Sequence, residues 1–527
     1  MLKIKNYYSL VFSLILLFIF TIFAWLNIDK GLEGIDDANI YFVYMKNLAN
    51  GFGFVYNKNS ENVEGFTSLL WTLLGGFLIF INLKINIVLI FINIFLLFLF
   101  VRKSYKFIAS SNLIPFFFYF FIFSSSGFVE WNILSLLETG LWTFLIAYIT
   151  LILLLDETHD YKIILFLCLL IFTRPESLIL VPFFFFTKII FDIINRNFNI
   201  NEILKIAFFI IINYLVLFSY RIYFFNSLFP NTYYAKLGSN TLEEIFNGIL
   251  YIKIFLKQNI VYLIIILLAF LRIIKIIMIN RIKENKEIIF LICLIFLSFF
   301  IALVVGGDHF GLYRFFQPFI IIYALLFLYT INDLKINKNY VFILAILIST
   351  ITSNNNFYKI YKSKYSPAKI EWTIVAINKN QALFLNRMFD NKLPKIGVLA
   401  AGAMAYNYNG FSIDLLGLNN VLMARSQKNP IGPKNHASFN KEIFYKQKPD
   451  IIIANIITKS NENIKVPMSL GSWEKRLLNN IDEDNYFNNL YSKYIVFDTK
   501  TNLSISAYML DEFVTNLSSS RYKVTKF

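Results

Sequence analysis

The sequence predicts a mostly α-helical, polytopic membrane protein that carries a soluble α/β domain at its C-terminal end. Of its 527 residues, 57% are hydrophobic and only 16% are charged, whereas soluble domains are roughly half apolar and a quarter charged. Apolar runs such as residues 260–279 and 288–305 carry few charges and are long enough to cross a bilayer core of about 30 Å. Beyond Thr352 these runs give way to charged and Asn-rich segments.

The first apolar run, residues 8–26, follows Lys3 and Lys5. A secretory signal begins in the same way, but this run is long and no small-x-small cleavage site follows it. We therefore expect an uncleaved signal anchor, a cytoplasmic N-terminus and a first outside loop at residues 27–67.

The distribution of charge along the remaining membrane part predicts its topology. Basic or mixed loops recur at residues 102–106, 156–162, 188–196, 272–286 and 332–339. If all are cytoplasmic, as positively charged loops usually are, the outside turns are residues 124–138, 173–177, 227–236 and 306–314. This assignment gives about eleven to thirteen spans. It requires residues 68–101 to cross the membrane an odd number of times, although residues 82–86 suggest a break in that stretch. The chain then divides into a membrane domain, 1–352, and an outside α/β domain, 353–527.

Three segments of the outside domain have the pattern of buried strands with polar ends: residues 393–410, 448–456 and 491–499. The Gly-rich piece 397–402 weakly resembles a dinucleotide-binding loop but lacks its full spacing and downstream acid.

The basic loops explain the net charge of +16, and no nucleic-acid module accompanies it, so we expect no nucleic-acid partner.

Cysteine and histidine usage predicts neither a disulfide framework nor a metal centre. Cys168 and Cys293 each lie inside an apolar run and are expected to be core residues. His159, His309 and His436 are scattered and lack the spacing of zinc ligands.

The first outside loop is the stretch richest in polar residues. Asp36 and Asp37 directly precede residues 38–50, which have the pattern of an amphipathic helix ended by Gly51. In a structural interpretation, a carboxylate caps this helix and the helix dipole keeps it ionised. In a catalytic interpretation, the pair serves chemistry at the bilayer surface, because it directly follows a span and its loop contains glycines that predict defined turns.

Five short segments of this loop form an ordered series: DDANI at 36–40, NLA at 47–49, GFGFVYN at 51–57, VEGFT at 63–67 and LW at 70–71. The series resembles the first periplasmic loop of GT-C class glycosyltransferases, most closely the branch of the mycobacterial terminal arabinofuranosyltransferases. One position departs from the family pattern, because Val43 stands where the family has Arg before the second Tyr of the helix.

Later segments continue this resemblance in the same order: SLLETGLW at 135–142, FTRPESL at 172–178, FPNTYYAK at 229–236, GGDHFGLYRFFQP at 306–318, and, in the outside domain, IGVLAAGAMAYNYNG at 396–410, IDLLGLNN at 413–420 and GPKNHA at 432–437. The likeness therefore extends over most of the chain.

Transfer of a sugar from a polyprenyl phosphate needs a base for the acceptor hydroxyl, cations for the departing phosphate and an apolar groove for the lipid. Asp37 or Asp36 is the candidate catalytic base, and its neighbour is an orienting or capping group. The predicted cations can bind phosphate oxygens, and the acids and tyrosines can bind the sugar or the membrane interface. The predicted substrate-binding residues are Glu138, Arg174, Glu176, Asn231, Tyr233, Lys236, Asp308, Tyr313 and Arg314.

Structural alternatives stay open for the charged members of this set. Arg174, Glu176 and Arg314 could form salt bridges that hold helix ends together. Lys236 could be a lysine that snorkels to the membrane surface. Ionisable groups near membrane depth are costly, however, and usually functional, which favours the binding role.

The resemblance implies an inverting glycosyltransferase in the cell (inner) membrane. It would move a monosaccharide from a polyprenyl-phosphate donor to an envelope glycan, lipid or protein on the outer face. The resemblance does not fix the sugar as arabinose. It leaves a divalent metal ion open as a cofactor, although no acidic cluster demands one.

Two other functions are alternatives to this one. A transporter or flippase of lipid-linked sugars would need polar groups at the midplane and repeated halves, and the sequence contains neither. A non-catalytic envelope-assembly scaffold of the same fold is the other alternative, against which the retained Asp pair argues.

Overall fold

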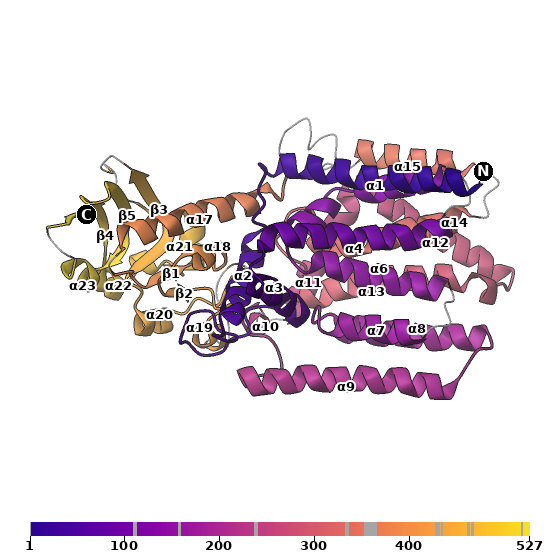
Figure 1. Cartoon of the computed structure of the whole chain (residues 1–527), viewed down its shortest axis with the longest axis horizontal. Coiled ribbons are helices and arrows are strands. Elements are labelled where there is room, and N and C mark those ends of the chain that lie inside the picture. Colours follow the sequence, from indigo (N-terminus) through magenta and orange to yellow (C-terminus); the bar gives the residue numbers. More distant parts are fainter. Residues whose placement is uncertain are drawn as a thin grey trace.

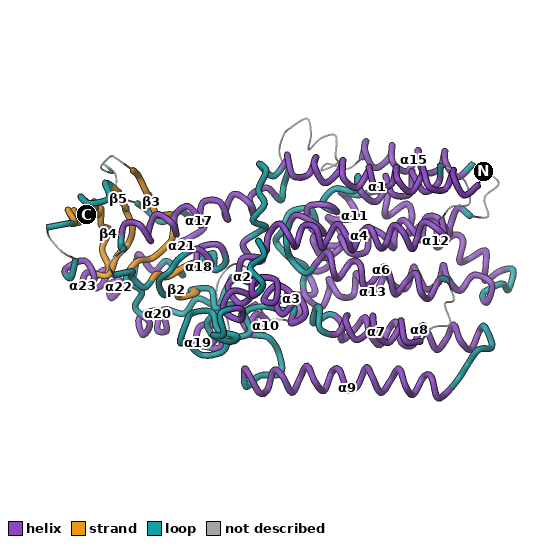
Figure 2. The backbone as a smooth tube through the Cα atoms, viewed as in Figure 1, coloured by secondary structure: helices purple, strands orange, loops and turns teal. Residues whose placement is uncertain are grey.

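A computed structural model describes residues 2–108, 113–155, 160–236, 241–332, 337–352, 366–390, 392–426, 433, 436–460, 464, 468–517 and 520–527. Parts of four sequence features lie outside these residues: 156–159 of one basic loop (with His159), 333–336 of another, the expected domain boundary after Thr352 at 353–365, and 432 and 434–435 of the GPKNHA segment. The described residues form a helix bundle, followed by a domain that contains the strands (Figure 2).

The helices of the bundle follow one another along the chain as α1 (Leu2–Asn27), α2 (Asp36–Ala49), α3 (Leu69–Phe80), α4 (Ile85–Ile108), α5 (Ile114–Phe123), the π-helix η1 (Glu130–Leu134), α6 (Thr139–Leu154), α7 (Asp160–Ile171), α8 (Ser177–Ile194), α9 (Ile200–Phe225), α10 (Asn231–Lys236), α11 (Thr241–Gln258), α12 (Ile260–Met278), η2 (Lys283–Asn285), α13 (Lys286–Val305), η3 (Arg314–Phe319), α14 (Ile320–Ile331) and α15 (Lys338–Thr352). Among the described residues, seven helical segments are long and apolar enough to cross a membrane, and five shorter helices are also apolar. The prediction of a mostly α-helical, multi-pass membrane protein is confirmed.

The break expected at residues 82–86 is real. The helix α3 has 12 residues, which at about 1.5 Å per residue is too short to cross a bilayer core. The chain then turns through Asn82, whose φ of 62° is left-handed, and α4 runs for 24 residues. Since α4 alone is long enough to span, one crossing in residues 68–101 fits the odd number that the charge pattern requires.

The domain after the bundle contains α17 (Lys369–Met388), β1 (Ile396–Val398), α18 (Ala403–Asn407), β2 (Ser412–Asp414), α19 (Val421–Arg425), α20 (Lys441–Gln447), β3 (Ile451–Ser460), α21 (Ser472–Leu477), η4 (Ile481–Glu483), α22 (Asn485–Leu490), β4 (Tyr491–Asp498), β5 (Leu503–Leu510), α23 (Asp511–Thr515) and β6 (Tyr522–Lys526). The strands form one mixed sheet in the order β2-β1-β3-β5-β4-β6. The strand β1 pairs in parallel with β2 and β3, and the remaining pairs are antiparallel. The predicted α/β domain and its three predicted strands, β1, β3 and β4, are confirmed.

The two ends of the bundle differ in chemistry. The C-terminal domain lies at the end where α2, α3 and α10 are found, and the N-terminus lies at the other end (Figure 1). Near the domain, an ion pair between Arg174 and Glu138 joins two of the polar turns. At the opposite end, Lys286 donates a hydrogen bond to Asn195 and joins two of the basic loops. The two polar turns joined by the first contact and the two basic loops joined by the second therefore lie at opposite ends of the bundle.

Buried polar contacts hold the first loop between the bundle and the C-terminal domain. The Glu64 carboxylate accepts from Nε of Arg221 on α9 at 3.0 and 3.1 Å. The Tyr44 hydroxyl donates to Oδ1 of Asn419 at 2.9 Å. That Oδ1 atom would lie 1.9 Å from a Cβ on Gly65, so the glycine of the VEGFT segment permits this close approach.

Candidate active site

The acidic pair lies in the first turn of α2, at the junction between the bundle and the C-terminal domain. The helix begins after Ile35, whose backbone is extended (φ −99°, ψ 171°) and whose side chain makes no capping hydrogen bond. Neither Asp therefore occupies the N-cap of its own helix. Asp36 and Asp37 project to different surroundings, because successive helical side chains lie about 100° apart around the axis.

Asp36 is an anchor for the C-terminal domain. Its carboxylate accepts hydrogen bonds from the backbone N–H groups of Gly402 and Ala403, each at 2.9 Å. A Cβ on Gly402 would lie 1.9 Å from the Asp36 carbonyl oxygen, so the Gly-rich piece 397–402 contributes to this contact. Burial raises the pKa of Asp36 to about 6, although the two N–H groups act in the opposite direction.

Asp37 is the acid that remains partly open, with 27% of its side chain exposed. Its Oδ2 lies 3.5 Å from Nη1 of Arg314. Burial disfavours the charged carboxylate, but the positive charges of Lys236 and Arg314 outweigh it and hold the pKa of Asp37 below its usual value. The carboxylate is therefore ionised at neutral pH, as a proton acceptor must be.

Arg314 is fixed by both charge and aromatic contact. Its Nε donates to Asp308 Oδ2 at 3.1 Å, and its guanidinium carbon lies 4.2 Å from the centroid of Phe310 and 5.9 Å from that of Trp131. Guanidinium groups stack well on aromatic rings and form directed bonds with acids. The predicted residues Asp308 and Arg314 therefore meet Asp37 in one cluster.

Arg174 lies in the same region, but its charge is already matched. Its Nη1 contacts Glu138 Oε1 at 2.6 Å, and its Nε and Nη2 bind both oxygens of Glu176 at 3.1 and 2.7 Å. Two carboxylates thus surround one buried guanidinium. The ion pairs anticipated by the structural alternative are present, and they reduce the charge that Arg174 can offer to a phosphate. Among the described atoms, Oε2 of buried Glu138 has no hydrogen-bond partner.

A pocket with about 330 Å³ of open space connects the two arginines. Arg174, Glu176 and Arg314 form its polar part. The rest is mainly apolar and is lined by Thr139, Trp142, Ile301, Phe315, Pro318 and Phe319. A charged end next to aromatic and aliphatic walls matches the chemistry of an amphipathic ligand.

Lys236 ends the short helix α10 and is half-buried. No carboxylate lies within ion-pair distance of its Nζ in the part of the chain that the structure describes. Burial lowers its pKa, while the charge of Asp37 acts in the opposite direction. Lys236 therefore differs from Arg174 and Arg314, because no acid neutralises it at close range.

Asn231, at the start of α10, contacts the C-terminal domain. Its Nδ2 donates to the carbonyl oxygens of Gly417 at 2.8 Å and Leu418 at 3.0 Å. Tyr233 points elsewhere: it is 42% exposed and its ring stacks on Phe229 at 4.7 Å between centroids. The predicted sugar contacts of both residues stay predictions, and for Asn231 the geometry adds a role in positioning Lys236.

We expect Asn231→Ala to destabilise the protein by about 1–3 kcal/mol, because one buried and one half-buried carbonyl oxygen lose their donor. Thermal unfolding of the purified protein in detergent measures this loss. Asn516→Ala, at an exposed position after α23 with a φ of −85°, provides the matched control. Equal midpoints for the Asn231 variant and the wild type would contradict the positioning role.

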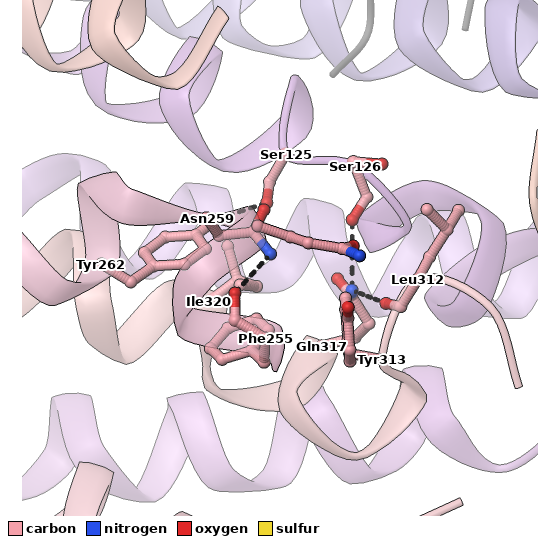
Figure 3. A pocket seen from close by; sticks show the side chains of 10 residues that line it. Ser125, Ser126, Phe255, Asn259, Tyr262, Leu312, Tyr313, Gln317 and Ile320 are labelled. Carbon is pink, nitrogen blue, oxygen red and sulfur yellow. Dashed lines mark hydrogen bonds between the residues drawn. The ribbon is translucent and has the colours of Figure 1, made fainter. Parts of the chain in front are cut away.

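Tyr313 directly precedes Arg314 but contacts other rings, because its ring centroid lies 5.5 Å from that of Tyr251 and 5.4 Å from that of Phe255. Its own φ of 54° and that of Leu312, 64°, are left-handed, which directs the two adjacent side chains apart. Tyr313 lines a second pocket, with about 260 Å³ of open space, where Gln317 donates to the carbonyl oxygens of Ser126 and Leu312 (Figure 3). Its predicted role in binding the sugar or the membrane interface stays a prediction.

Several residues near the site were missed by sequence reasoning. Glu371, in the first turn of α17, has its pKa raised to about 8 by burial and by the charges of Asp37 and Asp36. His309 and His436 were treated as scattered, yet their ring centroids lie 4.8 Å apart. Both histidines belong to segments that carry the family resemblance, and this was the signal available in the sequence.

The donor set does not fit a divalent metal ion. Asp37 and Asp308 both face Arg314, so a metal ion would have to displace a buried guanidinium. Among the described residues, no group of three or more His, Cys, Asp or Glu side chains is placed to hold one. We therefore derive no catalytic step through a metal ion.

Comparison with known sequences adds one match. Residues 368–509 match a family described as a domain of unknown function (DUF8728). No curated protein matches the chain. The matched segment covers α17 to most of β5 and therefore contains Gly402, Asn419, His436 and Glu371, but none of the residues of the bundle.

Proposed function

We propose that this protein is an inverting membrane glycosyltransferase that uses a polyprenyl-phosphate monosaccharide as donor. The observation that carries the proposal is the juxtaposition of Asp37, partly exposed and ionised, with Arg314 and the unneutralised Lys236 beside a pocket that is charged at one end and apolar along its walls. These are the groups that sugar transfer from a lipid phosphate requires.

In the proposed reaction, the acceptor oxygen attacks the anomeric carbon and the bond from that carbon to the phosphate oxygen breaks. Its electron pair stays on the phosphate, and the hydroxyl proton passes to Asp37, which later releases it to water. The hydroxyl becomes more acidic as the new bond forms, so a carboxylate of low pKa suffices as the acceptor. One displacement inverts the anomeric configuration.

In this proposal each of the three cations, Lys236, Arg314 and Arg174, has a different role. Lys236 binds the departing phosphate, because its charge is not spent on an acid. Arg314 holds Asp37 in place and adds positive charge where the phosphate departs. Arg174, matched by Glu138 and Glu176, shapes the pocket wall, and the unpartnered Glu138 oxygen is available to accept from a sugar hydroxyl.

We place this chemistry on the outer face of the cell membrane, with an envelope glycan, lipid or protein as acceptor. The polar turns and the C-terminal domain gather at the end of the bundle opposite the basic loops, and basic loops favour the cytoplasm. Polar groups at one end of the bundle support catalysis at a membrane surface over transport, which would need polar groups at the midplane.

Purified full-length protein in liposomes tests the proposal. Candidate polyprenyl-phosphate sugars with a labelled sugar are supplied with envelope acceptors, and loss of labelled donor is measured together with the envelope glycans of a deletion strain. We expect donor consumption and an altered glycan. Unchanged glycans with no donor consumed would end the enzyme proposal, and translocation of intact donor would favour a flippase.

The pH profile of transfer provides an independent prediction. Because the pKa of Asp37 is held below its usual value, we expect kcat/KM of the wild type to fall only below about pH 4. Lys236→Met removes a positive charge, raises the pKa of Asp37 and should move this acid limb to higher pH.

Lys379→Met is the matched control, because Lys379 pairs with Glu33 outside the cluster. Its acid limb should coincide with that of the wild type. Coincident limbs for the Lys236 variant and the wild type would show that Lys236 does not act on Asp37.

A further inference from the structure

An aromatic strip leads outward from the candidate active site over the C-terminal domain. It begins at Phe310, which contacts the Arg314 guanidinium and lies 4.2 Å from His309 between ring centroids, with the two rings tilted by 31°. His436 of the C-terminal domain lies 4.8 Å from His309, and Trp473 of α21 lies 6.1 Å from His436. The rings of Phe310, His309, His436 and Trp473 are called the aromatic strip below.

Most of the aromatic strip is accessible to solvent. His309 is exposed and His436 is half-buried, and Trp473 keeps 47% of its surface exposed. Packing of the C-terminal domain on the 306–314 turn explains the contact between the two histidines. It does not explain why the indole of Trp473 is exposed. Of the two histidines, Trp473 contacts only His436, so a small residue in its place would leave the contact between His309 and His436 intact.

The chemistry of the strip favours a sugar over an acyl chain. A sugar ring has an apolar face of C–H groups and a polar rim, which matches an aromatic face with a polar ring edge. An acyl chain needs a continuous aliphatic groove, whereas the guanidinium carbon of Arg476 lies 5.7 Å from the Trp473 ring. The neighbouring rings meet at 70° and 69°, so the strip is stepped and offers separate places for successive sugar units.

We propose that the aromatic strip is the acceptor subsite and that the acceptor is a glycan whose sugar units stack along it. The proposal rests on the glycosyl transfer proposed above. Because the strip begins at Phe310, next to the Arg314 that contacts Asp37 at 3.5 Å, a glycan seated on it directs its terminal hydroxyl toward the proposed base. Of the three acceptor classes, the strip thus selects the glycan.

Saturation-transfer NMR on the full-length protein in detergent tests the subsite directly. The probe is the mixture of oligosaccharides released from envelopes of the source cells by mild acid. We expect transfer of saturation to sugar C–H protons with the wild type, a signal about fivefold lower with Trp473→Ala, and a largely retained signal with Trp473→Phe, which keeps a stacking face. Tyr486→Ala, which removes another exposed aromatic residue of the same domain (53% exposed), should match the wild type.

The outcomes separate this proposal from the enzyme proposal. An absent wild-type signal, equal signals with Trp473→Ala and the wild type, or saturation confined to acyl protons of an added lipid extract would overturn the glycan subsite. Donor consumption by the wild type is measured on the same preparation. If Trp473-dependent glycan binding occurs without any donor consumption, glycosyl transfer fails and the subsite stands. If the donor is consumed but glycan binding does not depend on Trp473, the subsite fails and the proposed glycosyl transfer stands.

Discussion

Asp37→Asn is expected to lower the rate of sugar transfer about 10²–10⁴-fold, because a neutral amide cannot accept the proton of the acceptor hydroxyl. The substitution keeps the size and planarity of the side chain. Asn can still accept from Arg314 through its oxygen, and the position is 27% exposed, so the folded state should be nearly as stable as the wild type. Transfer assays and thermal unfolding on the same preparation measure both effects.

The neighbouring acid supplies the matched control. Asp36→Asn replaces one of the two oxygens that accept from Gly402 and Ala403 with an amide nitrogen that cannot accept. We expect a loss of about 1–3 kcal/mol of stability, because a buried N–H group is left without a partner, and transfer should fall only with the folded fraction. A stable but inactive Asp36→Asn together with an active Asp37→Asn would reverse the two roles.

Arg314→Lys is expected to lower transfer about 10²-fold, the usual effect of removing one preorganised electrostatic group. Lysine keeps the positive charge, but a single ammonium cannot contact Asp308 and Asp37 in the directions used by Nε and Nη1. It also loses the planar face that lies 4.2 Å from the centroid of Phe310. Transfer rates with saturating donor and acceptor measure the effect.

Two further variants define what this result means. Arg314→Met removes the charge altogether, leaves buried Asp308 without its partner and should cost about 3–5 kcal/mol of stability. Arg272→Lys makes the conservative change at the other end of the bundle, where Arg272 donates to the Thr330 carbonyl, and should leave transfer unchanged. Full activity in Arg314→Lys would show that charge alone suffices at this position.

Local patterns predicted much of the fold. Apolar runs gave the spanning helices because a long apolar segment has few stable environments other than a bilayer. Short apolar runs with polar ends predicted β1, β3 and β4, whereas β2 and β6, at the edges of the sheet, and β5 did not stand out from sequence patterns. The clustering of Asp37, Asp308 and Arg314 was anticipated because each lies in a polar turn at the same end of the bundle.

The different roles of the charged residues within the cluster could not be predicted from local patterns. Asp36 and Asp37 are adjacent in sequence and chemically identical, and only the packing of Gly402 against α2 makes one an anchor and leaves the other open. The sequence predicts Arg174 as a phosphate ligand, whereas in the structure Glu138 and Glu176 both pair with its guanidinium. Leu312 and Tyr313 adopt a left-handed turn that no glycine in the sequence indicates.

The sequence by itself determined a multi-pass helical protein with a separate α/β domain and a set of polar turns at one end, because hydropathy and charge act on each segment separately. The tertiary structure decided which carboxylate is open, which cation keeps its charge, and that His309 meets His436 from across 127 positions of the chain (436 minus 309). These outcomes depend on contacts between distant segments, and the energy of such a contact is a property of the pair, which neither segment encodes alone.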